Sequence, residues 1–261
     1  MKKLLLAMTA VAAFTGSAFA ADLPARTYTK APPPAPVWSW TGFYIFGGAG
    51  GGLWSSDQHT QLTATGIPLG IDTRQGGSGW FGTVGAGYDW QINQSWVFGV
   101  LADGQFGSIR GNIIDTRFGW TGFEKLQDQW AAGVRVGYLV APNVLSYVNG
   151  GYAGAHFSGT EMFSIASGLA TGNHTNSFNR NGWFVGGGVE NNLNIFGITA
   201  PGWFMKTEYR AAYYDRKSID ELRDGTNALF GNSVTFRPLV QTISTSLVYR
   251  FNWGGPVVAK Y

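Results

Sequence analysis

The sequence predicts an all-β fold: an eight-stranded antiparallel up-and-down transmembrane β-barrel with four long outer loops. Three observations carry this prediction. Segments of about ten residues alternate between apolar and polar side chains, as strands do between lipid and a polar lumen. Aromatic residues recur near both ends of these segments, and the connections between them are alternately long and short. The last segment, 241–251, alternates most clearly and should pair with the first to close the sheet.

The composition agrees with a barrel and disagrees with a helical membrane protein. Aromatic residues make up 15% of the 261 residues, glycine occurs 39 times, and charged residues are only 13%. After residue 20, no apolar run reaches the roughly 20 residues that a membrane-spanning helix needs. The main alternative is a secreted soluble β-sandwich or barrel. Its strands would also alternate, but nothing in a soluble core requires two aromatic belts.

Residues 1–20 have the features of a cleaved signal peptide. Lys2 and Lys3 give a positive start, 4–14 are mostly apolar, and Ala18-Phe19-Ala20 is a small-x-small cleavage site. The apolar run is too short for a membrane-spanning helix. Removing Lys2 and Lys3 leaves 16 of the 18 basic residues against 15 acidic ones. The mature chain, from Ala21, is nearly neutral, so the sequence gives no reason to expect a nucleic-acid partner.

Three parts are expected after the signal peptide: a proline-rich periplasmic lead-in at 21–39, the barrel at 40–251 and a C-terminal tail at 252–261. Because proline cannot donate to a sheet ladder, the lead-in should be an extended spacer. Its five prolines are Pro24, Pro32, Pro33, Pro34 and Pro36. Cysteine is absent, which excludes disulfides, thiolate metal sites and a cysteine nucleophile.

Eight strands are expected within the barrel. Their approximate ranges are 40–54, 80–90, 96–106, 129–138, 144–157, 183–190, 203–213 and 241–251. The long connections, expected to be surface loops, are 55–76, 107–124, 158–180 and 215–232. The short ones, expected to be periplasmic turns, are 91–94, 141–143 and 191–202. A barrel with more strands would need 55–76 and 158–180 to cross the membrane, which their polar composition and Pro68 disfavour.

The spacing of aromatic residues matches the height of a lipid-facing band. Trp80 and Trp90, and likewise residues 96 and 106 and residues 203 and 213, are ten residues apart. At about 3.3 Å per residue and a tilt of about 40°, this spacing covers roughly 25 Å. The expected girdle residues are Trp40, Trp54, Trp80, Trp90, Trp96, Trp130, Tyr138, Trp183, Trp203 and Tyr213. At the end of the last strand, Leu247, Tyr249 and Phe251 are expected to form the signal for barrel assembly.

The inward-facing positions collect charged residues. The expected lumen charge network consists of Asp103, Arg135, Glu190, Lys206, Glu208 and Arg210. A barrel of eight strands has an interior that side chains just fill, so a structural network of paired charges is the favoured interpretation. The alternative is a narrow gated path for ions or small solutes, lined by the same charges.

No catalytic or metal site is expected. Strand glycines could suggest a phosphate loop, but such a loop needs a following helix, and none is expected. The three histidines, His59, His156 and His174, fall in or near the long connections, and their spacing matches no metal-ligand pattern. Ser158 and Ser164 lie near His156 in sequence, but nothing indicates a third group that would orient a nucleophile and base.

Short motifs in a fixed order give the chain a family resemblance. They are Trp40-Thr41-Gly42-Phe43-Tyr44, Val97-Phe98-Gly99-Val100 with Asp103, Arg135-Val136-Gly137-Tyr138, Gly186-Gly187-Gly188-Val189-Glu190, Glu208-Tyr209 and Tyr249-Arg250-Phe251. From about 38 to 251, the chain resembles the alphaproteobacterial outer-membrane immunogenic proteins, which are small OmpA-like β-barrel surface antigens. It departs from that pattern at 252–261, which continues beyond the terminal aromatic residue.

The resemblance implies a structural barrel in the outer membrane of a Gram-negative cell, without enzymatic activity. It implies a role in envelope integrity and in contact with a host or the environment. The expected partners are outer-membrane lipids, lipopolysaccharide and the barrel-assembly machinery. We expect a monomer without cofactors. The alternative function is a small porin-like pore for ions or small solutes.

Overall fold

The computed structural model describes residues 39–195 and 198–251, with side chains described outside 194–200. The expected signal peptide, most of the proline-rich lead-in and the tail at 252–261 lie outside the described residues. All regular elements of the described chain are strands. A search of the described residues for a helix of membrane-spanning length and hydropathy found none.

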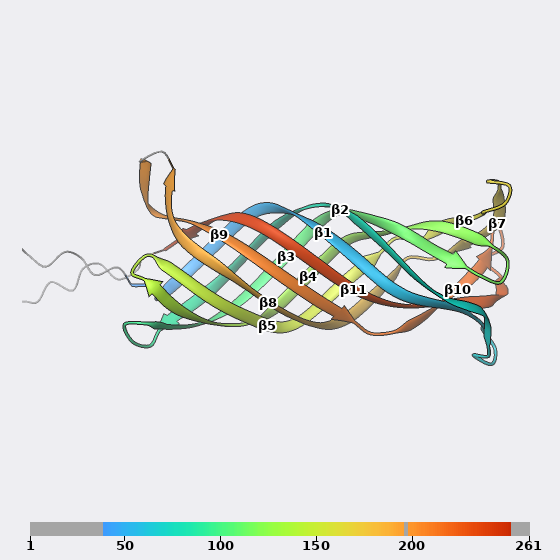
Figure 1. The fold of residues 1–261 in the computed structure, drawn as a ribbon, viewed down its shortest axis with the longest axis horizontal. Helices are drawn as coiled ribbons and strands as arrows, with labels where there is room; N and C mark the ends of the chain where they lie inside the picture. The colour runs from blue at the N-terminus through green and yellow to red at the C-terminus, as the bar shows by residue number, and fades with distance from the viewer. Residues whose placement is uncertain (1–38, 196–197, 252–261) are drawn as a thin grey trace, which may run out of the picture. The chain divides into compact units, whose positions relative to one another are not determined.

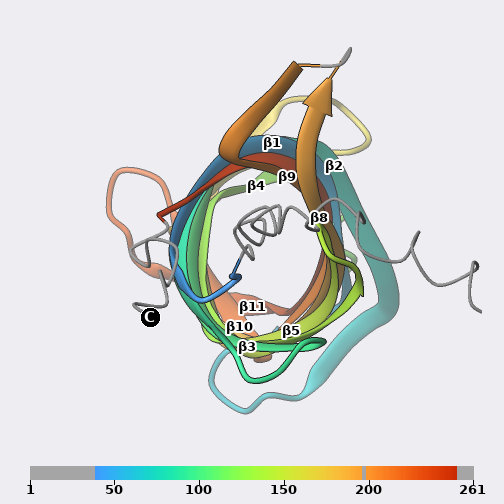
Figure 2. The same ribbon diagram turned by 90° about the vertical axis from the view of Figure 1, so that its left-hand side faces the viewer.

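Eleven strands form one antiparallel sheet. Eight of them pair in the order β1-β2-β3-β4-β5-β8-β9-β11, and β11 pairs back onto β1, which closes the ring (Figures 1 and 2). The predicted eight-stranded antiparallel barrel is therefore confirmed. The strands are β1 Gly42–Leu62, β2 Pro68–Gln91, β3 Trp96–Asp115, β4 Trp120–Ala141, β5 Val144–Phe157, β6 Thr160–Ser164, β7 Ala170–Thr175, β8 Phe178–Ile195, β9 Ile198–Tyr214, β10 Lys217–Arg223 and β11 Leu229–Arg250.

The long outer connections are mostly strand, which differs from the expected loops. β1 and β2 extend through most of 55–76, β3 and β4 do the same for 107–124, and 158–180 and 215–232 contain β6, β7 and β10. The three short strands have only 5, 6 and 7 residues. Alternation over so few residues is a weak signal, so the sequence alone did not predict these strands.

These additional strands close a second ring at the outer end. β4 pairs with β6, β6 with β7, β7 with β10, and β10 with β11. The ring β1-β2-β3-β4-β6-β7-β10-β11 therefore also has eight strands and continues the barrel beyond the last residues of β5 (Figure 1). Because each strand pairs on both sides, the outer extension leaves few backbone groups without partners.

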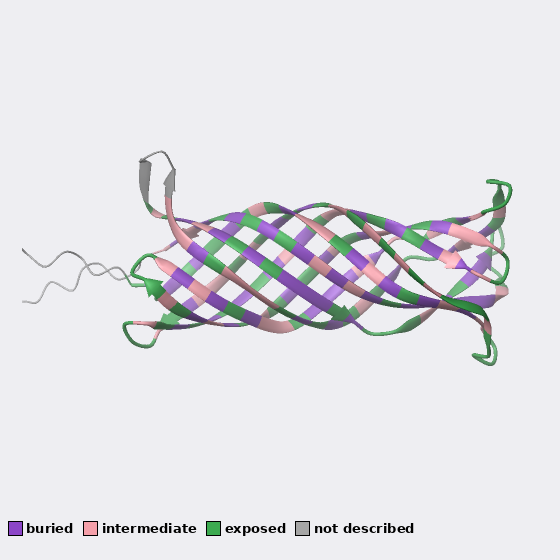
Figure 3. Ribbon diagram, in the orientation of Figure 1, coloured by how far each residue is buried: buried purple, intermediate pink, exposed green. Residues whose placement is uncertain are grey.

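Buried and exposed residues alternate along the strands (Figure 3). Eight of the ten expected girdle residues are exposed on the outside of the barrel, from Trp203 and Tyr213, each 39% exposed, to Trp80, 79% exposed. Leu247 is also exposed, and Tyr249 and Phe251 are half-buried. The other members of the exposed girdle set are Trp90, Trp96, Trp130, Tyr138 and Trp183.

Trp40 and Trp54 are wrongly assigned to the girdle. Both are only 1% exposed and point into the barrel. Trp54 follows outward-facing Leu53, so the period of two turns it inward. It packs where Gly111 leaves no side chain, since a Cβ there would lie 2.5 Å from the Trp54 ring. Trp40 precedes β1, where the strand period does not apply, and it covers the end of the lumen near the short turns.

Candidate functional site

The lumen is the part of this barrel where polar chemistry gathers. Near the short turns, four charged side chains from four strands form a closed ion-pair network. Arg135 Nε donates to Asp89 Oδ1 at 2.8 Å, Arg135 Nη2 pairs with Asp89 Oδ2, and Arg135 Nη1 lies 3.2 Å from Glu190 Oε2. Arg250 bridges the same two carboxylates, with Nη1 2.8 Å from Asp89 and Nε 2.7 Å from Glu190.

This quartet, Asp89, Arg135, Glu190 and Arg250, carries no net charge and is covered by aromatic rings. Asp89 and Glu190 are fully buried, Arg135 is 2% exposed and Arg250 is 5% exposed. The Arg250 guanidinium lies 4.3 Å from the ring centroid of Trp40, and that of Arg135 lies 4.3 Å from the ring centroid of Tyr44. Buried charges are tolerated only when they are paired in this way.

A second neutral quartet lies further along the lumen. Arg210 binds Asp103 with both terminal nitrogens, at 2.9 and 2.7 Å, and its Nη2 also lies 2.7 Å from Glu208 Oε1. Lys206 Nζ is 3.8 Å from Glu208 Oε2 and 3.3 Å from the centroid of the Phe46 ring. Tyr147 and Asn149 donate to the same Glu208 oxygen at 2.7 and 2.9 Å.

Replacing Glu208 by alanine should therefore destabilise the barrel. Lys206 would lose its carboxylate partner, and Tyr147 and Asn149 would lose their acceptor inside the lumen. We expect the free energy of unfolding to fall by about 3 kcal/mol. The measurement is the urea midpoint of the refolded protein in detergent. Asp57→Ala is the control, because its 3.7 Å pair with Arg74 is exposed and should contribute little. Equal midpoints for the two variants would contradict the lumen network.

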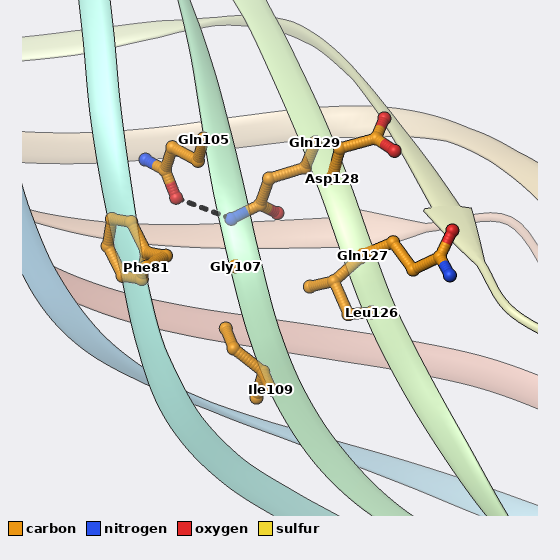
Figure 4. A pocket seen from close by; sticks show the side chains of 8 residues that line it. All are labelled: Phe81, Gln105, Gly107, Ile109, Leu126, Gln127, Asp128 and Gln129. Carbon is orange, nitrogen blue, oxygen red and sulfur yellow. Dashed lines mark hydrogen bonds between the residues drawn. The ribbon is translucent and has the colours of Figure 1, made fainter.

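Amide side chains form the next layer. Gln129 Nε2 donates to Gln105 Oε1 at 2.6 Å, and the Tyr214 hydroxyl donates to Gln129 Oε1 at 2.9 Å. A cavity of about 10 Å³ lies beside these amides, between Phe81, Ile109 and the glutamines (Figure 4). A space of this size holds at most one water molecule. Buried side chains line the lumen at this level.

Beyond the amides lies an apolar layer of the lumen. Trp54, Phe157, Phe178 and Phe236 form an aromatic cluster. Four pairs of their ring centroids lie 5.2–5.6 Å apart, and the centroids of Trp54 and Phe157 lie 6.5 Å apart. Aliphatic side chains pack around the cluster, including Ile109, Ile113, Leu126, Met162, Ile219, Val234 and Val240. We call this set the apolar plug. It separates the charged layers from the outer end of the barrel.

Three buried carboxyl groups lie in the outer part of the lumen, close to the apolar plug. Asp115, Glu124 and Glu221 are each fully buried. Asp115 Oδ1 accepts from Thr60 Oγ1 at 2.8 Å and from the Arg117 backbone nitrogen at 2.7 Å. No described residue donates a hydrogen bond to Asp115 Oδ2. The same is true of both carboxyl oxygens of Glu124 and of Glu221 among the described residues. Burial raises the pKa of Glu124 to about 8, and burial together with Asp115 raises that of Glu221 to about 8.

Glu124 and Glu221 make the stability of the barrel depend on pH. Their pKa is near 4.5 when the chain is unfolded and about 8 when it is folded. The folded state therefore favours the protonated forms, and their contribution is complete below pH 4.5 and is lost as the pH rises to about 8. We expect Glu221→Gln to reduce the fall in urea midpoint between pH 5 and pH 8.5. An unchanged fall would contradict a buried, protonated Glu221.

The structure brings all six expected lumen charges into the two quartets, and it adds Asp89 and Arg250. Both added residues follow the inward period of their strands, so the parity signal was present in the sequence. Each of the three histidines contacts a different residue. His59 lies 2.9 Å from Thr235 Oγ1, His156 lies 2.6 Å from Asn179 Oδ1, and His174 lies 2.7 Å from Asp224 Oδ1. Among the described residues, no group of three or more metal-binding side chains could hold an ion.

Comparison with known proteins agrees with this architecture. A family model described as the outer membrane protein beta-barrel domain matches residues 6–251. The chain belongs to this outer-membrane β-barrel family. The 31 kDa outer-membrane immunogenic proteins of Brucella melitensis and Brucella suis are each 32% identical to it over 263 residues, covering 96% of this chain and 100% of the relative.

The outer membrane protein OprG from Pseudomonas aeruginosa has a TM-score of 0.48 and 11% sequence identity, covering 81% of this chain and 97% of that one. The expected resemblance to outer-membrane immunogenic proteins and the expected location in the outer membrane are confirmed by the family and its Brucella members. In such barrels the short turns face the periplasm, so we expect the second ring to face the exterior.

Proposed function

We propose that this protein is a structural surface protein that strengthens the outer membrane and presents its outer ring to the surroundings. The observation that carries the proposal is the filled lumen. Two neutral quartets, an amide layer and the apolar plug occupy the barrel from the short turns to the outer ring. A closed barrel of this kind adds a rigid, lipid-anchored body to the membrane without adding a passage through it.

A small pore is the alternative function, and the packing does not favour it. Ions would have to pass both Arg135, which is paired with two carboxylates, and the apolar plug. Opening the first barrier separates buried charges, and opening the second exposes aromatic surface to water. Both steps are energetically costly. The proposal gives the protein no catalytic role, in keeping with relatives named as immunogenic outer-membrane proteins.

Insertion of a peptide epitope tests the surface role. The turn between β6 and β7 lies at the outer end, and Ile165 and Leu169 beside it are 57% and 70% exposed. An epitope at 166–167 should be labelled by antibody on intact cells. The control is the same epitope in the turn at Pro142 and Asn143, between β4 and β5, which should be labelled only after the cells are opened. If only the epitope at Pro142 and Asn143 were labelled on intact cells, the proposed orientation would be wrong.

Deletion of the gene tests the envelope role. Cells without the protein should take up more of a hydrophobic dye, and wild-type protein should restore the barrier. A variant with a weakened network, such as Arg135→Ala, should restore it less fully at the same expression level. Unchanged dye uptake after deletion would remove the support for a role in envelope integrity.

A further inference from the structure

Two basic side chains face each other on the outside of the barrel, above the aromatic girdle. Arg110 of β3 and Lys125 of β4 are direct cross-strand partners. Arg110 is exposed and Lys125 is half-buried. Like charges directly opposite each other destabilise an antiparallel pair. A counter-charge would relieve this repulsion.

Serine hydroxyl groups lie beside the pair. Arg110 Nε donates to Ser108 Oγ at 2.9 Å, and Ser78 is the cross-strand partner of Arg110 on the β2 side. Neither Arg110 nor Lys125 forms an ion pair within the part of the chain that the structure describes. The nearest acidic residue along β4 toward the membrane is Asp128, which lies opposite Phe106.

The height of the pair corresponds to the headgroup region of the outer leaflet. Arg110 lies four residues beyond Phe106, and Lys125 lies five residues before Trp130. At about 3.3 Å per residue and a tilt of about 40°, the two cations stand roughly 10 Å above the girdle. Phe106 and Trp130 are 59% and 47% exposed, so lipid chains can pack directly below the charges.

We propose that Arg110 and Lys125 bind a phosphate group of an anionic glycolipid in the outer leaflet. The proposal rests on the outward orientation of the second ring, which the proposed function includes. Two cations with a serine hydroxyl beside them match a phosphate, which accepts several charge-assisted hydrogen bonds.

A second charged region of the outer surface provides a matched control. Arg74 and Arg216 line a cleft of about 450 Å³ together with Asp57, Asp72 and His59. The two cations there are balanced by two carboxylates, and Arg74 lies 3.7 Å from Asp57. Removing two positive charges at this cleft changes the net charge of the protein as much as removing Arg110 and Lys125. The two pairs differ in their position and in the carboxylates beside them.

The test measures binding of purified lipopolysaccharide to the refolded full chain in a neutral detergent. Arg110→Gln combined with Lys125→Gln should weaken binding about 10- to 30-fold, whereas Arg74→Gln combined with Arg216→Gln should change it about 2-fold or less. The swap Arg110→Lys with Lys125→Arg should keep binding. Wild type should bind lipopolysaccharide stripped of its phosphates as weakly as the first double variant binds intact lipopolysaccharide.

Three results would overturn the proposal. Equal losses in the two double variants would mean a general attraction between the protein and an anionic surface. Unchanged binding in Arg110→Gln with Lys125→Gln would remove the site. Inorganic phosphate that binds as tightly as lipopolysaccharide would make free phosphate the ligand. None of these results depends on whether the lumen conducts, so the site and the closed barrel can fail separately. Heat-modifiable gel mobility confirms that each variant is folded.

Discussion

Replacing Arg135 by alanine is expected to lower the free energy of unfolding by about 3–5 kcal/mol. Arg135 is 2% exposed and neutralises Asp89 and Glu190 in the lumen. Without it, two buried carboxylates share the single remaining guanidinium of Arg250. The penalty comes mainly from the uncompensated charge left inside the barrel, and the pair itself contributes less than this difference.

Urea unfolding in detergent measures this effect, with gel mobility before and after heating as the test of folding. Arg74→Ala is the control, because Arg74 also pairs with an aspartate but its side chain is 70% exposed. We expect little change for it. The variant Asp89→Asn with Arg135→Gln should recover part of the loss, because fewer charges remain unpaired. A loss for Arg135→Ala no larger than that of the control would contradict a buried network.

Replacing Trp54 by alanine is expected to cost about 3–5 kcal/mol as well, for a different reason. The indole is 1% exposed, its ring centroid lies 5.3 Å from that of Phe236, and its Nε1 donates to the Ile109 carbonyl oxygen at 3.3 Å. Alanine would leave a cavity in the middle of the apolar plug and an acceptor without its donor. The surrounding strands are hydrogen-bonded on both sides and cannot move in to fill the cavity.

Trp80→Ala is the matched control for Trp54, since it removes the same side chain from the outside of the barrel. Trp80 is 79% exposed, so detergent or lipid takes the place of the lost ring. We expect the urea midpoint to fall much less for Trp80→Ala than for Trp54→Ala. A larger fall in the urea midpoint for Trp80→Ala would contradict the inward position of Trp54 and would favour its assignment to the girdle.

The local period of the strands was enough to predict the barrel and the facing of most residues. Asp103, Glu190 and Glu208 were placed inside because alternation depends only on near neighbours in sequence. The pairing of charges could not be predicted in the same way. Arg135 meets Asp89, 46 residues earlier, because the tilt and stagger of the closed sheet bring those strand positions together.

The short strands of the second ring could not be predicted from the sequence, for a different reason. β6 and β10 are short and carry mixed polar residues, so their alternation resembles that of a loop. They become strands because β4 and β11, which are already long, offer them edges with unpaired backbone groups. Trp54 was misplaced for a related reason: an aromatic residue at the end of an expected strand suggested the girdle, although the neighbouring Leu53 already occupied the outward position.

The most direct test of a closed structural barrel is the single-channel conductance of the refolded protein in a planar bilayer. Heat-modifiable gel mobility of the same sample shows that the protein is folded. We predict a folded protein without steady conductance, because the neutral quartets and the apolar plug fill the lumen. Steady conductance in a large share of folded molecules would contradict this account and would favour a pore lined by the lumen charges.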